Sequence, residues 1–267
     1  MITKLDILKT LAKIQAPRGG VVTVHTSLKS IGEIEGGGQT LLDALIEYFT
    51  DDGGLLVVPT HTWANLDVEG AITLDLCKSY TNLGVLPTLA LRDTRGVRSL
   101  HPTHSVTVFG KGAAEFARCD DTTDTFASPD GCYGEIYKRR GHVLLIGVGN
   151  DKNTFIHCAE EILGVPNRNA SEKIKTTVRH PDGSIKERML YPMYTEGTDD
   201  ISEYFPKFDA ALSHLDVMKR ARLGCAEIKL LSAVGIKDTV EKIFIASGGK
   251  EVLLTDWDIP TEYYDFT

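Results

Sequence analysis

The chain has 267 residues, of which 42% are hydrophobic, 25% charged and 7% aromatic, values typical of soluble globular proteins. A chain of this length buries enough surface to fold without disulfide or metal support, which excludes a small stapled scaffold. Lys and Arg total 29 against 37 Asp and Glu, so the formal net charge is -8 at pH 7. The sequence has no cluster of Lys and Arg that could bind a phosphate backbone, which argues against nucleic-acid binding.

The cysteines are dispersed and odd in number, and they contain no C-x-x-C pair or zinc-type spacing. This pattern is typical of reduced thiols in a cytosol. The N-terminal segment lacks the long apolar stretch of a signal peptide, and no apolar run approaches the roughly 18 residues that a membrane span requires. We therefore expect a cytoplasmic protein without a membrane partner.

The first part of the chain alternates helix-like and strand-like patterns. Apolar residues recur at helical spacing up to Ile14, and Pro17 with two glycines ends that helix. The expected elements are a helix over 5–14, a strand over 21–25, a polar loop over 26–30, a helix over 39–49 and a strand over 55–59. This order favours a parallel sheet covered by helices.

The middle of the chain contains the clearest buried strand, the apolar run over 142–148. A helix follows over 154–163 and ends before Pro166. Upstream, we expect a helix over 83–91, a strand over 107–109 and a short helix over 112–117. Strand-to-helix junctions, where α/β proteins place their sites, thus recur along the chain.

From residue 171 the pattern becomes an alternation centred on Asp182-Gly183, which predicts an antiparallel hairpin. Residues 201–221 have a helical pattern, and 225–253 combine short strands with one helix near 236–244. No repeat or low-complexity linker divides the chain. We expect one domain over 1–267 with an α/β fold: a central, mainly parallel sheet, flanking helices and a small antiparallel hairpin insertion at about 171–190.

Three segments place reactive side chains near predicted strand ends: 25–30, 101–105 and 153–161. In open α/β sheets, ligands bind beyond the carboxyl ends of strands, so these segments are candidate walls of a site. Each has a simpler alternative. The hydroxyls of 26–30 can cap the next helix, and His101 and His104 can belong to an ordinary turn.

His157 and Glu160 lie three residues apart on a predicted helix, so their side chains share one face. A carboxylate beside an imidazole orients the ring and raises its basicity, as a general base near neutral pH requires. The alternative is an ordinary surface pair. Cys158 points about 100° away from its neighbour on a helix, so we interpret it as a packing thiol.

In their joint order and spacing, these segments resemble the aminoglycoside 3-N-acetyltransferase family, which does not have the GNAT fold. The resemblance is strong over roughly 20–170 and has a weaker echo at 222–226. The matching stretches are His25-Thr-Ser-Leu-Lys-Ser-Ile-Gly32 with Gly36-Gly37, Leu56-Val-Val-Pro-Thr60 with Trp63, Arg98-Ser-Leu-His-Pro-Thr-His-Ser105, Tyr133-Gly-Glu-Ile-Tyr137, and 143–160.

The resemblance implies the α/β fold of that family, acetyl-CoA as the donor, and acetyl transfer to the 3-amino group of the 2-deoxystreptamine ring of aminoglycosides, which confers resistance. It makes His157 the base that activates the amine, with Glu160 beside it, and implies no metal. The residues it places at coenzyme A are Thr26, Ser27, Leu28, Lys29, Ser30, Ile31, Thr60, His101, Thr103, His104, Ser105 and Val106. Those it places at the acceptor are Trp63, Asp151 and Glu161.

One departure from the family concerns the loop near the acceptor. Where the family commonly reads Ser-Pro-Tyr/Leu-Gly, this chain has Gly131-Cys132-Tyr133-Gly134, which predicts a reshaped loop and leaves the acceptor open. Among several acidic clusters, Glu160-Glu161 is the pair we expect to attract a cationic amine. The partner is thus a small cationic substrate, and the protein a monomer or homodimer.

Three other functions stay open on the sequence alone. A metal-dependent hydrolase would use His25, His61, His101 and His104 with an acid such as Asp151 to activate water. An acetyltransferase could act on an amine that is not an aminoglycoside. A binding protein could keep the coenzyme A cleft without catalysing a reaction.

Overall fold

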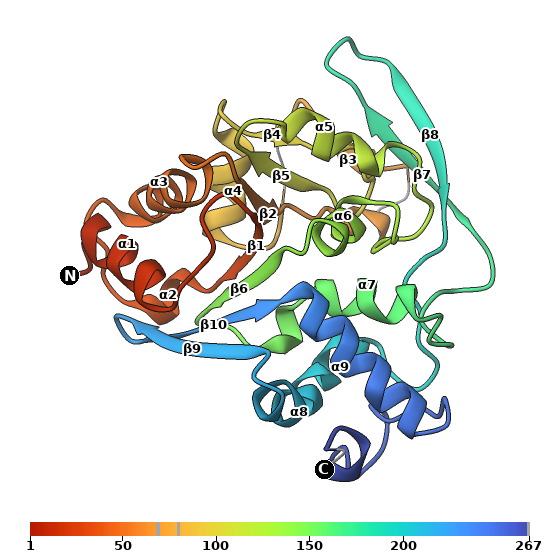
Figure 1. Ribbon diagram of the computed structural model, residues 1–267. Coiled ribbons are helices and arrows are strands. Elements are labelled where there is room, and N and C mark those ends of the chain that lie inside the picture. Colours follow the sequence, from red (N-terminus) through yellow and green to blue (C-terminus); the bar gives the residue numbers. More distant parts are fainter. Residues whose placement is uncertain (68–69, 79–80, 266–267) are drawn as a thin grey trace.

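The structure, a computed structural model, describes residues 1–67, 70–78 and 81–265, and its centre is a seven-stranded sheet (Figure 1). Across the sheet the strands are β4 (Val97–Arg98), β5 (Val106–Phe109), β2 (Leu55–Pro59), β1 (Val21–Thr26), β6 (His142–Ile146), β10 (Ala226–Ser232) and β9 (Met218–Leu223). β1 pairs in parallel with both β2 and β6. β5 and β10 run opposite to these strands, while β4 and β9 run with them. Most strands therefore share one direction, which confirms the predicted mainly parallel sheet.

Helices pack on both faces of this sheet. One face carries α1 (Lys4–Lys13), α3 (Gly37–Thr50) and α4 (Val85–Arg92). The other carries α5 (Ala113–Ala117), α6 (Cys132–Lys138), α7 (Phe155–Ile162), α8 (Asp209–His214) and α9 (Ala233–Ala246). The remaining helical segments are the four-residue α2 (Leu28–Ile31) and the 3₁₀ helices η1 (Trp63–Asp67), η2 (Arg118–Asp121), η3 (Asn150–Lys152), η4 (Ile201–Phe208) and η5 (Thr261–Tyr263).

Alternating side chains of the central strands supply the two hydrophobic cores. Val21 packs into the core beneath α6 and α7, and its neighbour Val22 packs into the core beneath α3. The pairs Leu55/Leu56 and Val143/Leu144 divide in the same way, because successive strand residues point to opposite faces. Burial on both faces explains why these strands read as continuous apolar runs.

The edge where the parallel strands end gathers the three segments that the sequence singled out. β1, β2 and β6 all point their carboxyl ends there, since they are parallel. The antiparallel β5 begins at the same edge, and its ladder with β2 continues outward: Thr60 N donates to Ser105 O (2.8 Å) and Thr62 N to Thr103 O (2.7 Å). Sheet topology alone thus brings chain segments far apart in sequence to one place.

The predicted hairpin is present and stands out from the body of the protein (Figure 1). It forms a separate small sheet of β3 (Leu74–Asp75), β7 (Ile174–Arg179) and β8 (Ile185–Leu190), in which β7 and β8 are antiparallel. Arg188 of β8 fastens it to the body: Nη1 donates to Leu100 O (3.0 Å) and Asp120 O (2.9 Å), and Nη2 donates to Thr123 O.

Some predicted elements differ from the structure. The expected loop over 26–30 contains the short helix α2, and α6 was not predicted. The helical pattern over 201–221 ends at His214, and β9 begins at Met218, because pairing with β10 supplies hydrogen bonds that override local helical periodicity.

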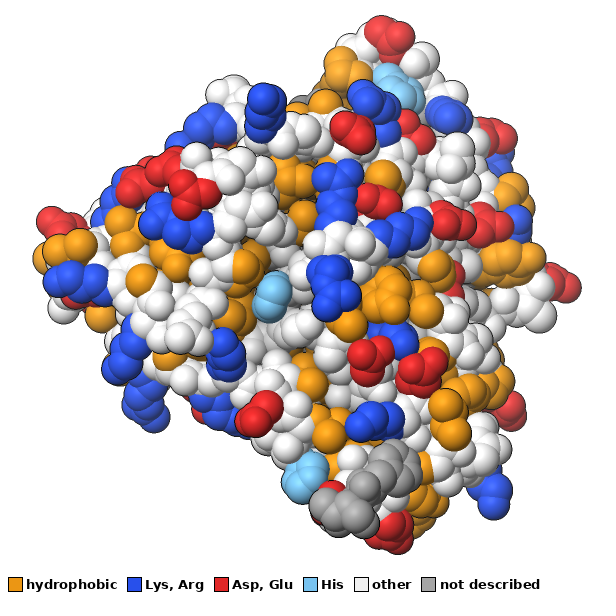
Figure 2. Space-filling model, in the orientation of Figure 1, with side chains coloured by type: hydrophobic (Ala, Val, Ile, Leu, Met, Phe, Trp, Pro, Cys, Tyr) orange, Lys and Arg blue, Asp and Glu red, His pale blue; other side chains and the backbone are white. Residues whose placement is uncertain are grey.

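The surface carries charges of both signs. On the face that Figure 2 shows, acidic and basic side chains are interspersed, with hydrophobic patches between them. Surface ion pairs such as Arg18 with Asp52 (2.9 Å) and Arg220 with Glu227 (2.9 Å) are part of this mixture. It agrees with the lack of a basic block in the sequence. Within the described ranges, no helix combines the length and apolar character needed to cross a bilayer.

Gly147 occupies a position that a larger residue would disturb. Its φ is +67°, and a Cβ there would lie 2.6 Å from Ser30 Cβ. Gly53 also has positive φ, +83°, but has open space around it. We expect Gly53→Ala to lower the free energy of unfolding by about 1–2 kcal/mol, the cost of the left-handed conformation. Gly147→Ala should lower it by about 1–3 kcal/mol more through overpacking.

Urea unfolding of both variants measures the difference. Equal losses in the two variants would show that the contact between the β6 exit and α2 is not tight.

Candidate active site

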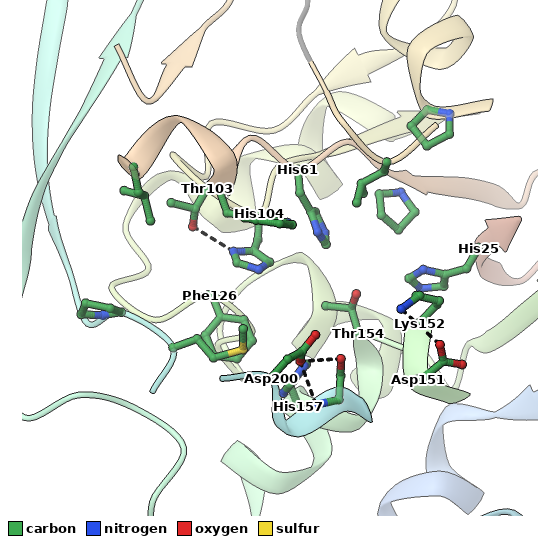
Figure 3. Close-up of a pocket in the computed structure, with 18 of the residues that line it drawn as sticks. His25, His61, Thr103, His104, Phe126, Asp151, Lys152, Thr154, His157 and Asp200 are labelled. Carbon is green, nitrogen blue, oxygen red and sulfur yellow. Dashed lines mark hydrogen bonds and ion pairs between the residues drawn. The ribbon is translucent and has the colours of Figure 1, made fainter. Parts of the chain in front are cut away.

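A cavity of about 750 Å³ opens at the edge where β1, β2 and β6 end, a size in the usual range for ligand sites. Side chains from the ends of those strands and from the β5 entry meet around it (Figure 3). Among the lining residues are His25, Thr26, His61, Trp63, Thr103, His104, Phe126, Asp151, Lys152, Thr154, His157, Asp199, Asp200 and Ser202.

His157 lies on α7, with its ring packed between two phenylalanines. The ring centroids of Phe126 and Phe205 are 4.9 and 4.6 Å from that of His157. Burial lowers the pKa of His157 to about 3, although the nearby Asp200 carboxylate opposes this effect (Figure 3). The imidazole is therefore neutral at physiological pH, the form that can accept a proton. Its Nδ1 atom is buried without a hydrogen-bond partner.

Glu160 has a different partner from the expected one. Its Oε1 atom pairs with Arg168 Nη2 (2.9 Å), and Arg168 Nη1 pairs with Glu251 (2.8 Å). Glu160 and Arg168 are almost fully buried, with 2% and 7% of their side chains exposed. A buried carboxylate needs a charged partner to offset its lost hydration, which a neutral imidazole does not provide. Glu160 Oε2 remains without a partner, and no hydrogen bond between Glu160 and His157 is formed.

His101 is held in a structural role. Its Nδ1 accepts hydrogen bonds from the backbone N–H groups of Thr103 (3.2 Å) and His104 (2.9 Å), which leaves Nε2 to donate to Thr125 O (2.9 Å). Both ring nitrogens are thus engaged in shaping the turn. Burial lowers the pKa of His101, so the ring stays neutral and inside the protein.

Two histidines that line the cavity, His61 and His104, also have their own partners. His61 Nε2 hydrogen-bonds the Tyr133 hydroxyl (2.9 Å), and His104 Nδ1 pairs with Thr103 Oγ1 (2.9 Å). Burial lowers the pKa of His61, His104 and His25, the last to about 4. Across the described ranges, no group of three or more His, Cys, Asp or Glu is arranged to hold a metal ion. The hydrolase hypothesis, which needs four histidines to converge, therefore finds no support in this geometry.

The segments expected at coenzyme A divide into lining and supporting residues. Thr26, Thr103 and His104 line the cavity. Four more, around the end of β1, lie outside the cavity lining: Lys29 is exposed, and Ser27, Leu28 and Ser30 are half-buried. The remaining five are buried behind the wall and do not line it: Ile31, Thr60, His101, Ser105 and Val106.

The residues expected at the acceptor divide as well. Trp63 and Asp151 line the cavity, and Asp151 pairs with Lys152 (3.1 Å). Glu161 does not line it, because its carboxylate accepts a hydrogen bond from Thr125 instead. The acidic residues that reach the cavity are Asp151, Asp199 and Asp200; the adjacency of Asp199 and Asp200 in the sequence was the available signal for that pair.

Sequence reasoning missed Phe126 and the hairpin exit over 190–193, which line the cavity too, whereas Thr154 lines it from the expected segment 153–161. The segment that departs from the family begins α6. Its Tyr133 hydroxyl hydrogen-bonds a cavity residue, His61. Cys158 is buried and its thiol pKa is raised by that burial, which agrees with its interpretation as a packing thiol.

Comparison with known proteins gives consistent matches. The family model for aminoglycoside 3-N-acetyltransferases matches residues 23–245. The SPbeta prophage-derived aminoglycoside N(3')-acetyltransferase-like protein YokD of Bacillus subtilis (strain 168) is 26% identical over 94% of this chain and 95% of its own length. Aminoglycoside N(3)-acetyltransferase IV of Salmonella sp is 32% identical, but the alignment spans only 61% of this chain and 60% of that protein.

A solved structure shares the fold. Aminoglycoside acetyltransferase AAC(3)-IVa, crystallised as a histidine-to-alanine mutant in complex with a gentamicin, superposes with a TM-score of 0.77 at 26% identity. The superposition covers 92% of this chain and 90% of that one.

The low pKa of His157 has a measurable effect on stability. Its pKa is about 3 in the folded protein and near 6.5 when unfolded, so the unfolded state binds the proton first as the pH falls below 6.5. At pH 5 this linkage costs about 2 kcal/mol of folding free energy. Between pH 7 and pH 5, the free energy of unfolding of His157→Gln should therefore fall by about 2 kcal/mol less than that of the wild type.

Urea unfolding of both proteins at the two pH values tests this expectation. An identical pH dependence would show that His157 titrates normally in the folded protein.

The Arg168 ion pairs give a second expectation. Arg168→Met leaves two carboxylates without their counter-charge, so the free energy of unfolding should fall by about 3–5 kcal/mol. Arg168→Met combined with Glu160→Gln removes the more buried charge and should recover part of that loss. Urea unfolding of the single and double variants measures both changes. If the double variant is no more stable than the single one, packing rather than charge explains the effect.

Proposed function

Because the chain belongs to the aminoglycoside 3-N-acetyltransferase family, we propose that it transfers the acetyl group of acetyl-CoA to the 3-amino group of the 2-deoxystreptamine ring of an aminoglycoside, and thereby confers resistance. The observation that carries the proposal is a neutral imidazole at a cavity whose wall also bears carboxylates: His157 lies close to Asp200. A carboxylate attracts the cationic amine, and the imidazole takes its proton.

The donor end of the proposed site lies where β1 ends. Lys29 is exposed there, and Ser30 Oγ donates to Ser27 Oγ (2.8 Å) at the start of the same short helix. His25 Nε2 is buried in the cavity region without a partner. Cations and hydroxyls suit phosphates, and an unpartnered nitrogen suits an amide, so this polar set fits coenzyme A. Acetyl-CoA supplies the acetyl group as a reactive thioester.

His157 is the proposed proton acceptor. Since Nδ1 is buried, we assign the acceptor role to Nε2, which requires the tautomer with hydrogen on Nδ1. Glu160 Oε2 is the matching buried acceptor without a partner, and it lies three residues further along the same helix. We propose that in the reacting complex a side-chain rotation joins these two atoms, while Arg168 keeps Oε1. In this way Glu160 would orient the ring in the reacting complex.

The acceptor end is proposed near Asp199 and Asp200. Ser202 N (2.9 Å) and Ser202 Oγ (2.6 Å) donate to Asp200 Oδ1, which fixes the carboxylate at the cavity wall. Asp151 and Trp63 line the same cavity. We propose that the enzyme acts in the cytoplasm as a monomer or homodimer; the polycationic acceptor would be held by these carboxylates.

Turnover is the direct test. With acetyl-CoA and kanamycin-, gentamicin- or neomycin-type acceptors, the full chain should release free thiol, and His157→Gln should lower kcat by about 10²–10⁴-fold, the usual contribution of a general base. Coenzyme A binding measured by calorimetry should persist in that variant, because Nε2 acts on the acceptor amine rather than on the donor.

Two results would count against the proposal. The absence of turnover with every aminoglycoside would remove the acceptor assignment, and near-wild-type kcat in His157→Gln would remove the histidine from its role. Coenzyme A binding without turnover across a broad panel of amines would favour a binding protein.

A further inference from the structure

One end of the cavity is apolar. It lies where the chain leaves the β7–β8 hairpin, next to the segment that carries Phe126. Phe126, Leu190, Tyr191 and Met193 line it there, and Trp63 and Leu66 of η1 add apolar side chains to the same cavity. Trp63, Leu66 and Met193 keep 43%, 37% and 38% of their surface exposed. Large apolar side chains that stay exposed around a cavity mark a surface that a ligand can cover.

The apolar wall is pre-formed, because hydrogen bonds hold the hairpin exit from two sides. Tyr191 N donates to Asp124 O (2.8 Å), and Ala170 N donates to Pro192 O (3.0 Å). Arg188 adds its bonds to three backbone carbonyls at the base of the hairpin. A ligand that lies on this wall therefore has no loop to order first.

This wall lies on the His157 side of the cavity. Phe126 packs on the His157 ring, with centroids 4.9 Å apart, and also on His104, at 4.9 Å. In Figure 3, His25 and Lys152 lie at the opposite end of the cavity from Phe126 and Thr103, with His157 and Asp200 between them. An acceptor whose nitrogen reaches His157 from the side away from β1 therefore lies on apolar side chains.

The apolar wall and the carboxylates of the cavity together fit an amphipathic cation, a ligand with a charged amine at one end and an apolar group at the other. Asp200, held by Ser202, can pair with one ammonium group beside His157. Beyond that point a ring gains most where it turns an apolar face to Leu190 and Met193, because a hydroxyl turned toward them would lose water without gaining a hydrogen bond. An aromatic or alicyclic ring would instead remove apolar surface from water on both sides.

We propose that the cavity accepts, besides aminoglycosides, a second class of acceptor: arylalkylamines, primary amines that carry an aromatic ring on a short methylene linker. This inference rests on the proposed function, because it uses the same transfer reaction. The nitrogen bonds to the acetyl carbon and the thioester C–S bond breaks. Of the two protons that the ammonium loses, one ends on the thiol of coenzyme A and the other is released.

The test compares amines of similar basicity in the thiol-release assay with the full chain. For 2-phenylethylamine, kcat/KM should exceed that for 2-aminoethanol by about tenfold or more, with kanamycin measured in parallel. Met193→Ser should lower this ratio about fivefold or more by placing a hydroxyl on the wall. Met189→Ser, on the same hairpin but outside the cavity lining and 50% exposed, should leave the ratio unchanged.

The outcomes separate this inference from the proposed function. Turnover of kanamycin without any preference for 2-phenylethylamine would overturn the arylalkylamine inference alone. No turnover with any amine would overturn the transfer reaction and this inference with it. Equal changes in the ratio for Met193→Ser and Met189→Ser would show that the wall does not select the acceptor.

Discussion

The parallel pairing of β1 with β2 and β6 is the constraint on which the site depends. Parallel strands place their carboxyl ends at one edge, so residues near positions 25, 61 and 157 meet although they are far apart in the chain. The antiparallel strand β5 adds to this edge. It begins beside the end of β2, so the turn over 101–105 that precedes it lies at the same place. Every proposed role of a cavity residue requires this shared edge.

Desolvation is the second constraint. The same packing that builds the cavity wall removes water from its histidines, and burial lowers the pKa of each. Burial keeps the His157 imidazole neutral at physiological pH, but the lowered pKa also makes it a weaker base than an exposed histidine. The same burial lowers the stability of the folded protein in acid, because the unfolded state binds the proton first.

Sequence patterns predicted those parts of the structure that local forces determine. The buried strands, the Asp182-Gly183 hairpin and the helix carrying His157 follow from periodicity and turn chemistry. The partner of Glu160 could not be predicted this way, because Arg168 and Glu251 come from separate segments and pair only after tertiary packing. The apolar hairpin exit was missed for a related reason: Tyr191 and Met193 have no local pattern that distinguishes a cavity wall from an ordinary surface.

The link between Arg168 and Glu251 also bears on how the protein is made. Glu251 follows α7 and its histidine by about ninety residues of sequence. β10, which completes the sheet beside β6, also comes later in the chain than α7. During synthesis, Arg168 can therefore neutralise Glu160 early, but the chain beyond residue 251 must emerge from the ribosome before Glu251 can pair with Arg168. The ion-pair group at Glu160, on the helix that carries His157, thus gains its last member only after that late segment has emerged.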